Sequence, residues 1–501
     1  MTDHASTLER LGTGSDALDA ILGGGIPARS VTVVAGEPGS GKTVFTLQLL
    51  FHHARQGKKC LYFTTLSEPA LKVIRYMQLF SFFDPRVIEE RILFADLGSF
   101  LRSGGVEQAM AHVTEHIEKE EPDLVAIDSF KAIHDILPGA ASGRTFAYDL
   151  AVSMAAWGAT TLLVGEYALA DIGAAPEFAI ADGIVRLSTE RQELTTARQL
   201  EVLKLRGADY VSGRHSFEIG AAGLTFYPRV RGPEMTGEPA VDLADRVATG
   251  IAGLDALLQG GLPRASATIV EGGTGAGKTL VGLHFLLEGA RRGEPGILFA
   301  LEETPAQIRA IAGNFGWDLA ALEAQGRLCI SYTSPVELFT DRFLDVARRL
   351  IERVGARYAV LDSLTSLSLG VPSERRFREL VYALTKHFRA AGVTPLMTME
   401  VAELLGTAQL TGHGVSSTAD NLILLRYVEM GGRLERAVSV LKARGSGHDT
   451  ELRRFLIDGR GAHVGARFED LRGVLTGIPQ PDRGAGRGVR RRSWQAEGRS
   501  R

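Results

Sequence analysis

Short apolar runs alternate with amphipathic helical patterns along most of the chain, and their order repeats in two halves. The β-branched run Val31–Val34 precedes a glycine-rich stretch and a helical pattern, and Thr268–Val270 does the same in the second half. Strands separated by helical patterns favour a mainly parallel sheet with helices on its faces. The pattern therefore predicts an α/β protein in which one domain type occurs twice.

The repeat can be aligned without gaps over its best-matched part. Thr13–Thr43 aligns with Thr249–Thr279, and more than half of the paired positions are identical. Further on, LVAIDS matches YAVLDS, GATTLLVGE matches GVTPLMTME, and LKLRG matches LKARG. The proline- and glycine-rich stretch between the halves is typical of a linker. We therefore expect four parts: a first domain (1–228), a linker (229–245), a second domain (246–478) and an Arg/Gly-rich tail (479–501).

Each half contains a phosphate-binding loop of the Walker A type. The first loop is GEPGSGKT (Gly36–Thr43) and the second is GGTGAGKT (Gly272–Thr279), each between an apolar strand and a helix. Glycines let successive backbone N–H groups surround a phosphate, and the positive end of the following helix faces the same charge. The pattern predicts that both halves bind ATP. The predicted ATP-binding residues are Gly36, Gly39, Gly41, Lys42, Thr43, Gly272, Gly275, Gly277, Lys278 and Thr279.

An acidic residue normally accompanies such a loop and holds the Mg²⁺ of the nucleotide. Asp128 and Asp362 each end an apolar strand, and each is followed by serine. Their carboxylates, together with the hydroxyls of Thr43 and Thr279, are the oxygen ligands expected around Mg²⁺. The sequence therefore predicts one magnesium site in each half.

The halves differ where a catalytic base is expected. In the second half the strand ILFAL leads into Glu302 and Glu303, and a carboxylate one strand from the P-loop can accept a proton from an attacking hydroxyl or water. The first half has Leu66 and Ser67 in these places, with Glu68 displaced by one residue. A displacement of one residue in a strand turns a side chain to the other face. We therefore expect the first half to bind ATP more readily than it hydrolyses it.

The chain resembles the KaiC family of RecA-like ATPases over about residues 7 to 478. The resemblance rests on the two TG…LD…GG.P…GxxxxGKT openings, FALEETPAQI, and DNLILLRYVEMGGRLERAVSVLKARGSGHD. It implies two tandem RecA-like P-loop NTPase domains in a double-layered homo-hexameric ring, with ATP between adjacent subunits. It also implies that Lys204 and Arg206, and likewise Lys442 and Arg444, reach the phosphates of the neighbouring subunit.

In that family the second domain can act as an autokinase on a Ser-Thr pair across the subunit interface. The matching positions, counted from Asp420, are Ser416 and Ser417, whereas the first half has Phe178 and Ala179. The half with paired glutamates is thus also the half with acceptor hydroxyls. The resemblance and this co-occurrence predict serine autophosphorylation in the second half. The candidate catalytic residues are Glu302, Glu303, Lys278, Lys442 and Arg444.

Composition and charge leave two other functions open. The net charge of -3 argues against a globally basic nucleic-acid binder, and no apolar stretch reaches membrane-spanning length. We therefore expect a cytoplasmic protein, with nucleic acid as a partner only through the Arg-rich tail. One alternative is an ATP-gated scaffold that has no kinase activity itself. A regulatory protein partner would recognise the shape that ATP binding gives it. The other is a DNA-dependent RecA-like ATPase.

Overall fold

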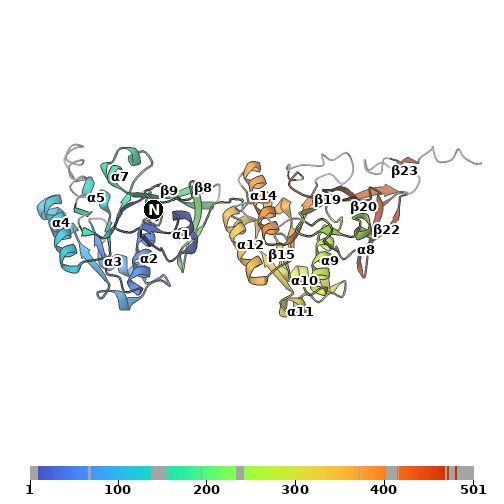
Figure 1. The fold of residues 1–501 in the computed structure, drawn as a ribbon, viewed down its shortest axis with the longest axis horizontal. Helices are drawn as coiled ribbons and strands as arrows, with labels where there is room; N and C mark the ends of the chain where they lie inside the picture. The colour runs from blue at the N-terminus through green and yellow to red at the C-terminus, as the bar shows by residue number, and fades with distance from the viewer. Residues whose placement is uncertain are drawn as a thin grey trace, which may run out of the picture. The chain divides into compact units, whose positions relative to one another are not determined.

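The computed structural model describes two compact units, Met1–Arg229 and Val230–Arg501, each with its own sheet and core. In each unit, helices pack against the faces of the sheet (Figure 1). The described residues are 9–65, 69–136, 153–154, 157–192, 195–232, 242–371, 373–401, 415, 417–430, 432–468, 471–472 and 480–481. No helix within these residues is long and apolar enough to cross a membrane.

The first unit is built on a sheet of nine strands within the described residues, in the order β11-β10-β9-β8-β3-β7-β6-β4-β5. The pairs from β5 to β8 are parallel, and the pairs from β8 to β11 are antiparallel. The strands are β3 (Val31–Gly36), β4 (Cys60–Thr64), β5 (Ile92–Asp96), β6 (Leu124–Asp128), β7 (Thr160–Glu166), β8 (Gly183–Gln192), β9 (Thr195–Leu205), β10 (Arg214–Gly220) and β11 (Gly223–Tyr227), with the antiparallel pair β1 (Arg10–Leu11) and β2 (Ile26–Pro27). The helices are α1 (Asp16–Leu22), α2 (Lys42–Arg55), α3 (Ala70–Met77), α4 (Gly98–Glu120), α5 (Phe130–His134) and α7 (Pro176–Ile180), with 3₁₀ turns η1 (Pro85–Val87) and η2 (Asp171–Gly173).

The second unit repeats this topology in the strand order β16-β15-β17-β18-β14-β19-β20-β21-β22. Its strands are β14 (Thr268–Gly272), β15 (Gly296–Ala300), β16 (Leu328–Tyr332), β17 (Tyr358–Asp362), β18 (Thr394–Glu400), β19 (Asn421–Met430), β20 (Arg433–Ala443), β21 (Arg453–Asp458) and β22 (Gly461–Arg467), with the pairs β12 (Arg246–Val247) and β13 (Leu262–Pro263), and β23 (Leu471–Arg472) and β24 (Gln480–Pro481). Its helices are α8 (Ala252–Leu257), α9 (Lys278–Arg291), α10 (Pro305–Gly313), α11 (Leu319–Ala324), α12 (Thr340–Val354), α13 (Leu364–Leu369) and α14 (Glu374–Ala390), with the 3₁₀ turn η3 (Pro335–Glu337). The predicted α/β class with two mainly parallel sheets is therefore confirmed.

Successive side chains of the central strand β14 point into two different apolar cores, one on each face of the sheet. Ile269 of β14 packs in the core formed with α12, α13 and α14, whereas Val270 packs in the core formed with α9 and α10. Successive residues of a strand point to opposite faces, so a continuous apolar run is what a strand covered on both faces requires. Figure 1 shows the helices on the two sides of this sheet.

The second unit begins with residues that pack onto its own helices. Val230 is buried in the core beside α12 and α14, and its backbone N–H donates to Asp341 Oδ1 at 2.9 Å. Asp341 is only 4% exposed, and Arg376 of α14 lies 3.7 Å from the same oxygen. The carbonyl oxygen of Arg231 lies 3.3 Å from His387 Nε2. The predicted linker 229–245 therefore starts with a docked segment.

Candidate functional site

Both P-loops lie at the carboxyl end of the central parallel strand of their sheet. Lys42 is the first residue of α2 and Lys278 the first residue of α9, so each lysine stands at a helix N-terminus. The preceding Gly41 and Gly277 have φ of 98° and 106°, in the left-handed region where a side chain is unfavourable. The sequence GxxxxGKT folds into this turn because glycine takes the backbone angles that the turn needs.

Of the two P-loop lysines, Lys42 is buried and Lys278 is half-buried, and both lie near carboxylates. Lys42 Nζ donates to the carbonyl oxygen of Glu37, and Lys278 Nζ donates to those of Gly272 and Gly273. Burial lowers the pKa of both lysines, and nearby carboxylates oppose this shift. Those carboxylates are Glu166, Asp128 and Glu37 around Lys42, and Glu400, Asp362, Glu302 and Glu303 around Lys278.

The predicted magnesium ligands come together in both halves. The hydroxyl of Thr43 donates to Asp128 Oδ2 at 2.8 Å, and the carboxylate of Asp362 accepts a hydrogen bond from Thr279. Burial raises the pKa of Asp362. Paired hydroxyl and carboxylate oxygens beside a phosphate loop fit the oxygen ligands that Mg²⁺ prefers. The residues present therefore suit the ion that the sequence predicts.

The paired glutamates of the second half have different surroundings. Glu302 Oε1 accepts a hydrogen bond from the hydroxyl of Ser363 at 2.7 Å and another from that of Ser366. The carboxylate of Glu303 is half-buried, and burial, with the negative charge of Asp362 as a smaller cause, raises its pKa. A carboxylate with a raised pKa accepts a proton more readily than one with the ordinary pKa of a glutamate. Glu303 is therefore the stronger candidate for general base, and Glu302 is fixed in place.

The first-half site has a cavity of about 690 Å³ beside its P-loop. Asp128 Oδ2 accepts hydrogen bonds from both Thr43 and the buried Tyr62, the latter at 2.6 Å. The second half has Leu298 in place of Tyr62 and uses Thr398 of β18 to hold Asp362 instead. Leu66, Ser67 and Glu68 lie outside the described residues. The cavity is lined by Gly39, Gly41, Lys42, Thr43, Val44, Tyr62, Thr64, Val73, Asp128, Ser129, Lys131, Ala132, Asp135, Glu166 and Ile219.

Sequence reasoning missed the strand-end carboxylate Glu400. It accepts a hydrogen bond from the P-loop hydroxyl of Thr274, and its backbone N–H donates to Thr365 Oγ1 at 2.9 Å. Glu166 is its counterpart in the first half, where the positions of these two partners are Pro38 and Lys131. A signal was present, because both glutamates end matching strands next to the P-loop strand.

The four cations that the resemblance assigned to a neighbouring subunit lie far from the P-loop of their own unit. Arg444 follows β20, where Ala443 pairs with Asn421, and Asn421 pairs with Thr268 at the start of β14. The P-loop begins at the opposite end of β14. Lys442 Nζ donates to the carbonyl oxygen of Ala419 at 2.6 Å. The matching first-half contacts are Lys204 Nζ to the carbonyl oxygen of Ala179 at 3.5 Å and Arg206 to Asp182 at 3.4 Å.

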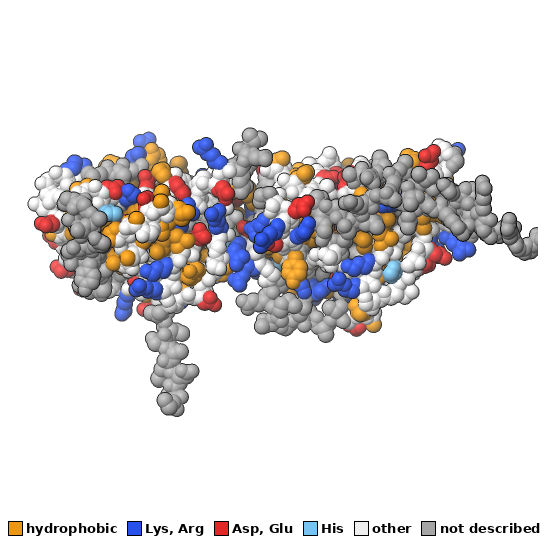
Figure 2. Space-filling view, turned by 90° about the horizontal axis from the view of Figure 1, so that it is seen from above, with side chains coloured by type: hydrophobic (Ala, Val, Ile, Leu, Met, Phe, Trp, Pro, Cys, Tyr) orange, Lys and Arg blue, Asp and Glu red, His pale blue; other side chains and the backbone are white. Residues whose placement is uncertain are grey.

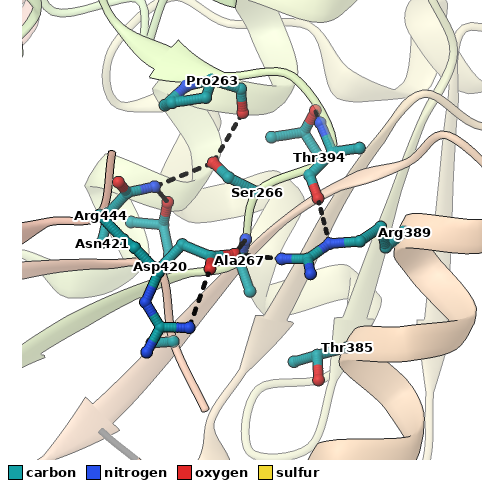
Figure 3. Close-up of polar contacts among 12 residues, drawn as sticks. Pro263, Ser266, Ala267, Thr385, Arg389, Thr394, Asp420, Asn421 and Arg444 are labelled. Atoms are coloured by element: carbon teal, nitrogen blue, oxygen red, sulfur yellow. Dashed lines mark hydrogen bonds and ion pairs between the residues drawn. The ribbon is translucent and has the colours of Figure 1, made fainter. Parts of the chain in front are cut away.

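Asp420 organises the end of the sheet where these second-half cations lie (Figure 3). Its carboxylate accepts from Arg389 and from the backbone N–H of Ala267, and Arg444 Nη1 lies 3.8 Å away. The Arg444 side chain is 61% exposed, and its Nη2 donates to the carbonyl oxygen of Ser417 at 3.4 Å. Ser417 is itself exposed, and Ser416 lies outside the described residues. An exposed serine and an exposed arginine are thus adjacent.

A duplicated α/β fold with a P-loop lysine and a hydroxyl–carboxylate pair in each half defines a tandem RecA-like ATPase. The KaiC ATPase family model matches residues 11–231 and again residues 247–469. The chain belongs to the KaiC family.

Relatives of known name agree with that assignment. The chain is 30% identical over 485 residues to the circadian clock protein KaiC3 of Synechocystis, covering 94% of this chain and 95% of the relative. It is 30% identical over 487 residues to the circadian clock oscillator protein KaiC of Prochlorococcus marinus, covering 94% and 95%. The KaiC of Thermostichus vulcanus is 29% identical over 491 residues, covering 95% and 93%.

Proposed function

We propose that the second half transfers the γ-phosphate of ATP to Ser416 and Ser417 of a neighbouring copy of the chain. The observation that carries the proposal is the arrangement of the second unit. It has a carboxylate of raised pKa, Glu303, at the P-loop end of the sheet and the exposed Ser417 at the other end. A serine at that end is remote from the P-loop of its own unit. Transfer between copies is the route that this separation favours.

The bond changes follow from the named groups. The serine Oγ attacks the γ-phosphorus, its proton passes to the carboxylate of Glu303, and the bond between the γ-phosphorus and the β,γ-bridging oxygen breaks to release ADP. Lys278 binds the phosphates. Bound Mg²⁺, held by Thr279 and Asp362, would neutralise phosphate charge. Lys442 and Arg444 of the copy that carries the serines supply further positive charge.

The first half has no hydroxyl where the second half carries its acceptors. Phe178 occupies that region and is buried in the core of the first unit, with Ala179 next to it. We propose that Lys42, Thr43 and Asp128 bind ATP chiefly to hold a homo-hexameric ring together, with Lys204 and Arg206 contacting nucleotide on the adjacent copy. Weak hydrolysis accompanies this role.

Mass spectrometry tests the autokinase directly. After incubation with Mg·ATP, the wild-type chain should gain one or two phosphates on Ser416 and Ser417, and a Ser416→Ala, Ser417→Ala variant should gain none there. The variant is the matched control because it keeps both P-loops and both glutamates. A wild-type chain that stays unmodified would leave the ATP-gated scaffold, read by a regulatory protein, as the function.

Two lysine variants test whether the first half serves ring assembly and the second half phosphoryl transfer. Lys42→Ala should weaken ring assembly, whereas Lys278→Ala should abolish phosphorylation and leave assembly largely intact, because each removes the phosphate contact of one half. Native mass spectrometry gives the number of subunits, and phosphate incorporation gives the activity. Equal loss of assembly in both variants would contradict the assignment.

A DNA-dependent ATPase is the second candidate. The formal net charge of -3 provides no overall attraction for a nucleic-acid backbone, and Figure 2 shows both acidic and basic side chains on one face of the described residues. The Arg-rich tail remains the segment with the right composition. Stimulation of ATP turnover by single-stranded DNA would support this candidate over the autokinase.

A further inference from the structure

Glu271 is a buried carboxyl group directly before the second P-loop. It is only 1% exposed, and neither of its carboxyl oxygens has a hydrogen-bond partner among the residues that the structure describes. The next residue, Gly272, ends β14 and begins the glycine-rich loop. An ionised carboxylate without a partner is costly to bury, so such a group tends to hold its proton. None of the chemistry described above uses this side chain.

Among the described residues, the strand partners of Glu271 are apolar, and one cation acts on its carboxyl group. Its strand partners are Met399 on β18 and Leu424 on β19. Ile269, two residues earlier on β14, packs in the same apolar core as Met399. Burial raises the pKa of Glu271 to about 7, and the charge of Arg426, two residues beyond Leu424, opposes this shift. Among the described residues, Arg426 is the charged group that acts on it.

The first half places a fixed ion pair where the second half has this titratable group. Ala35 occupies the position of Glu271, and its strand partner is Arg186 where the second half has Leu424. Arg186 Nη2 donates to Glu37 Oε1 of the first P-loop at 2.9 Å, and its side chain is 10% exposed. The first half therefore has an ion pair beside its P-loop strand, whereas the second half has a buried carboxyl group without a hydrogen-bond partner among the described residues.

We propose that Glu271 is a proton-responsive control group of the second ATP site, and that its ionisation weakens ATP binding there. A negative charge one residue before the loop repels the phosphates, and little water is present to screen it. By reciprocity, bound ATP favours the protonated carboxyl. The result is a second site whose affinity falls as the pH rises through the neutral range, beside a first site without this dependence.

The test measures the affinity of the full-length chain for a non-hydrolysable ATP analogue across the neutral pH range. The binding curve has a contribution from each ATP site, and the contribution that is lost in Lys278→Ala is assigned to the second site. In the wild-type chain this affinity should fall on the order of tenfold as Glu271 ionises. Glu271→Gln cannot ionise and should lose that fall. A terminal phosphate titrates in the same range, so the difference between wild type and variant is the quantity compared.

Two further variants show whether Glu271 itself is responsible. Arg426→Gln removes the opposing cation and should move the midpoint of the affinity change to higher pH. Glu323→Gln, a carboxyl-to-amide change in the ion pair of α11 with Arg309, should keep the wild-type profile. The proposal is overturned if Glu271→Gln keeps the fall in affinity. If that variant does not fold, an unchanged midpoint in Arg426→Gln overturns it.

This inference depends on ATP binding by the second half and not on phosphoryl transfer. A chain without serine phosphorylation but with the expected affinity profile would contradict the autokinase alone. A phosphorylated chain whose second-site affinity matches that of Glu271→Gln at every pH would contradict the control group alone. The two proposals therefore fail separately.

Discussion

Glu303→Gln is expected to lower the rate of phosphate release and transfer in the second half by about 10²- to 10⁴-fold, the usual contribution of a general base. Burial and the charge of Asp362 raise the pKa of Glu303, so this carboxylate accepts a proton more readily than an exposed one. The amide that replaces it cannot accept the proton of an attacking hydroxyl. Single-turnover measurements with labelled ATP give the rate.

Glu302→Gln is the matched control for this prediction. An amide oxygen can still accept the hydrogen bonds that Ser363 and Ser366 now give to Glu302, so the loss of rate should be much smaller. Both variants remove one negative charge from the surroundings of Lys278, so ATP affinity is measured separately from the rate. Equal losses of rate in the two variants would contradict the separate roles. The wild-type rate should also fall at acidic pH, as the raised pKa of Glu303 is crossed.

The second large effect is a stabilisation of the second unit by Glu271→Gln that grows with pH. The folded-state pKa of Glu271 is about 7 against an ordinary value of 4.5, so the folded chain holds a proton that the unfolded chain releases. The protonated Glu271 contributes fully to the free energy of unfolding below the pKa that it has in the unfolded chain. This contribution is lost as the pH rises through its pKa in the folded chain. The full loss is about 3 kcal/mol, at 1.36 kcal/mol per pKa unit.

Glutamine keeps the shape of the side chain and carries no charge at any pH. Chemical denaturation should therefore give similar free energies of unfolding for wild type and variant at about pH 4, and a more stable variant by about 3 kcal/mol at about pH 8. The comparison isolates one group, because every other titration is common to both chains. A difference that does not change with pH would show that Glu271 does not hold its proton in the folded state.

The parts of the fold and site that sequence could predict are those encoded in consecutive residues. The conformation of both P-loops, Gly36–Thr43 and Gly272–Thr279, could be predicted from sequence because it depends on glycine spacing and on the helix that follows, which are local properties. The strand-ending Asp128 and Asp362 could be singled out in the sequence because an acidic residue that ends a strand beside a P-loop commonly holds Mg²⁺. Pairing of each aspartate with its loop threonine then follows from the strand order of the fold.

The remaining features depend on which strands become neighbours. Glu302 and Glu303 are the same residue type in sequence, and the fold separates them: the start of α13 brings Ser363 and Ser366 to Glu302, whereas burial raises the pKa of Glu303. The burial of Glu271 could not be predicted from the sequence around it, because it depends on the elements that cover both faces of β14. The remoteness of Arg444 from its own P-loop depends on the antiparallel direction of β20, which no short motif records.

The docked start of the second unit fixes where the chain can be cut. The family model resumes at residue 247, but Val230 and Arg231 already pack against α12 and α14. A fragment that starts at residue 247 would leave the buried carboxylate of Asp341 without the backbone N–H of Val230, and would expose the apolar surface that Val230 covers. The second structural unit is therefore longer than the stretch that matches the family model. Its core includes Val230, which lies in the segment predicted as the linker.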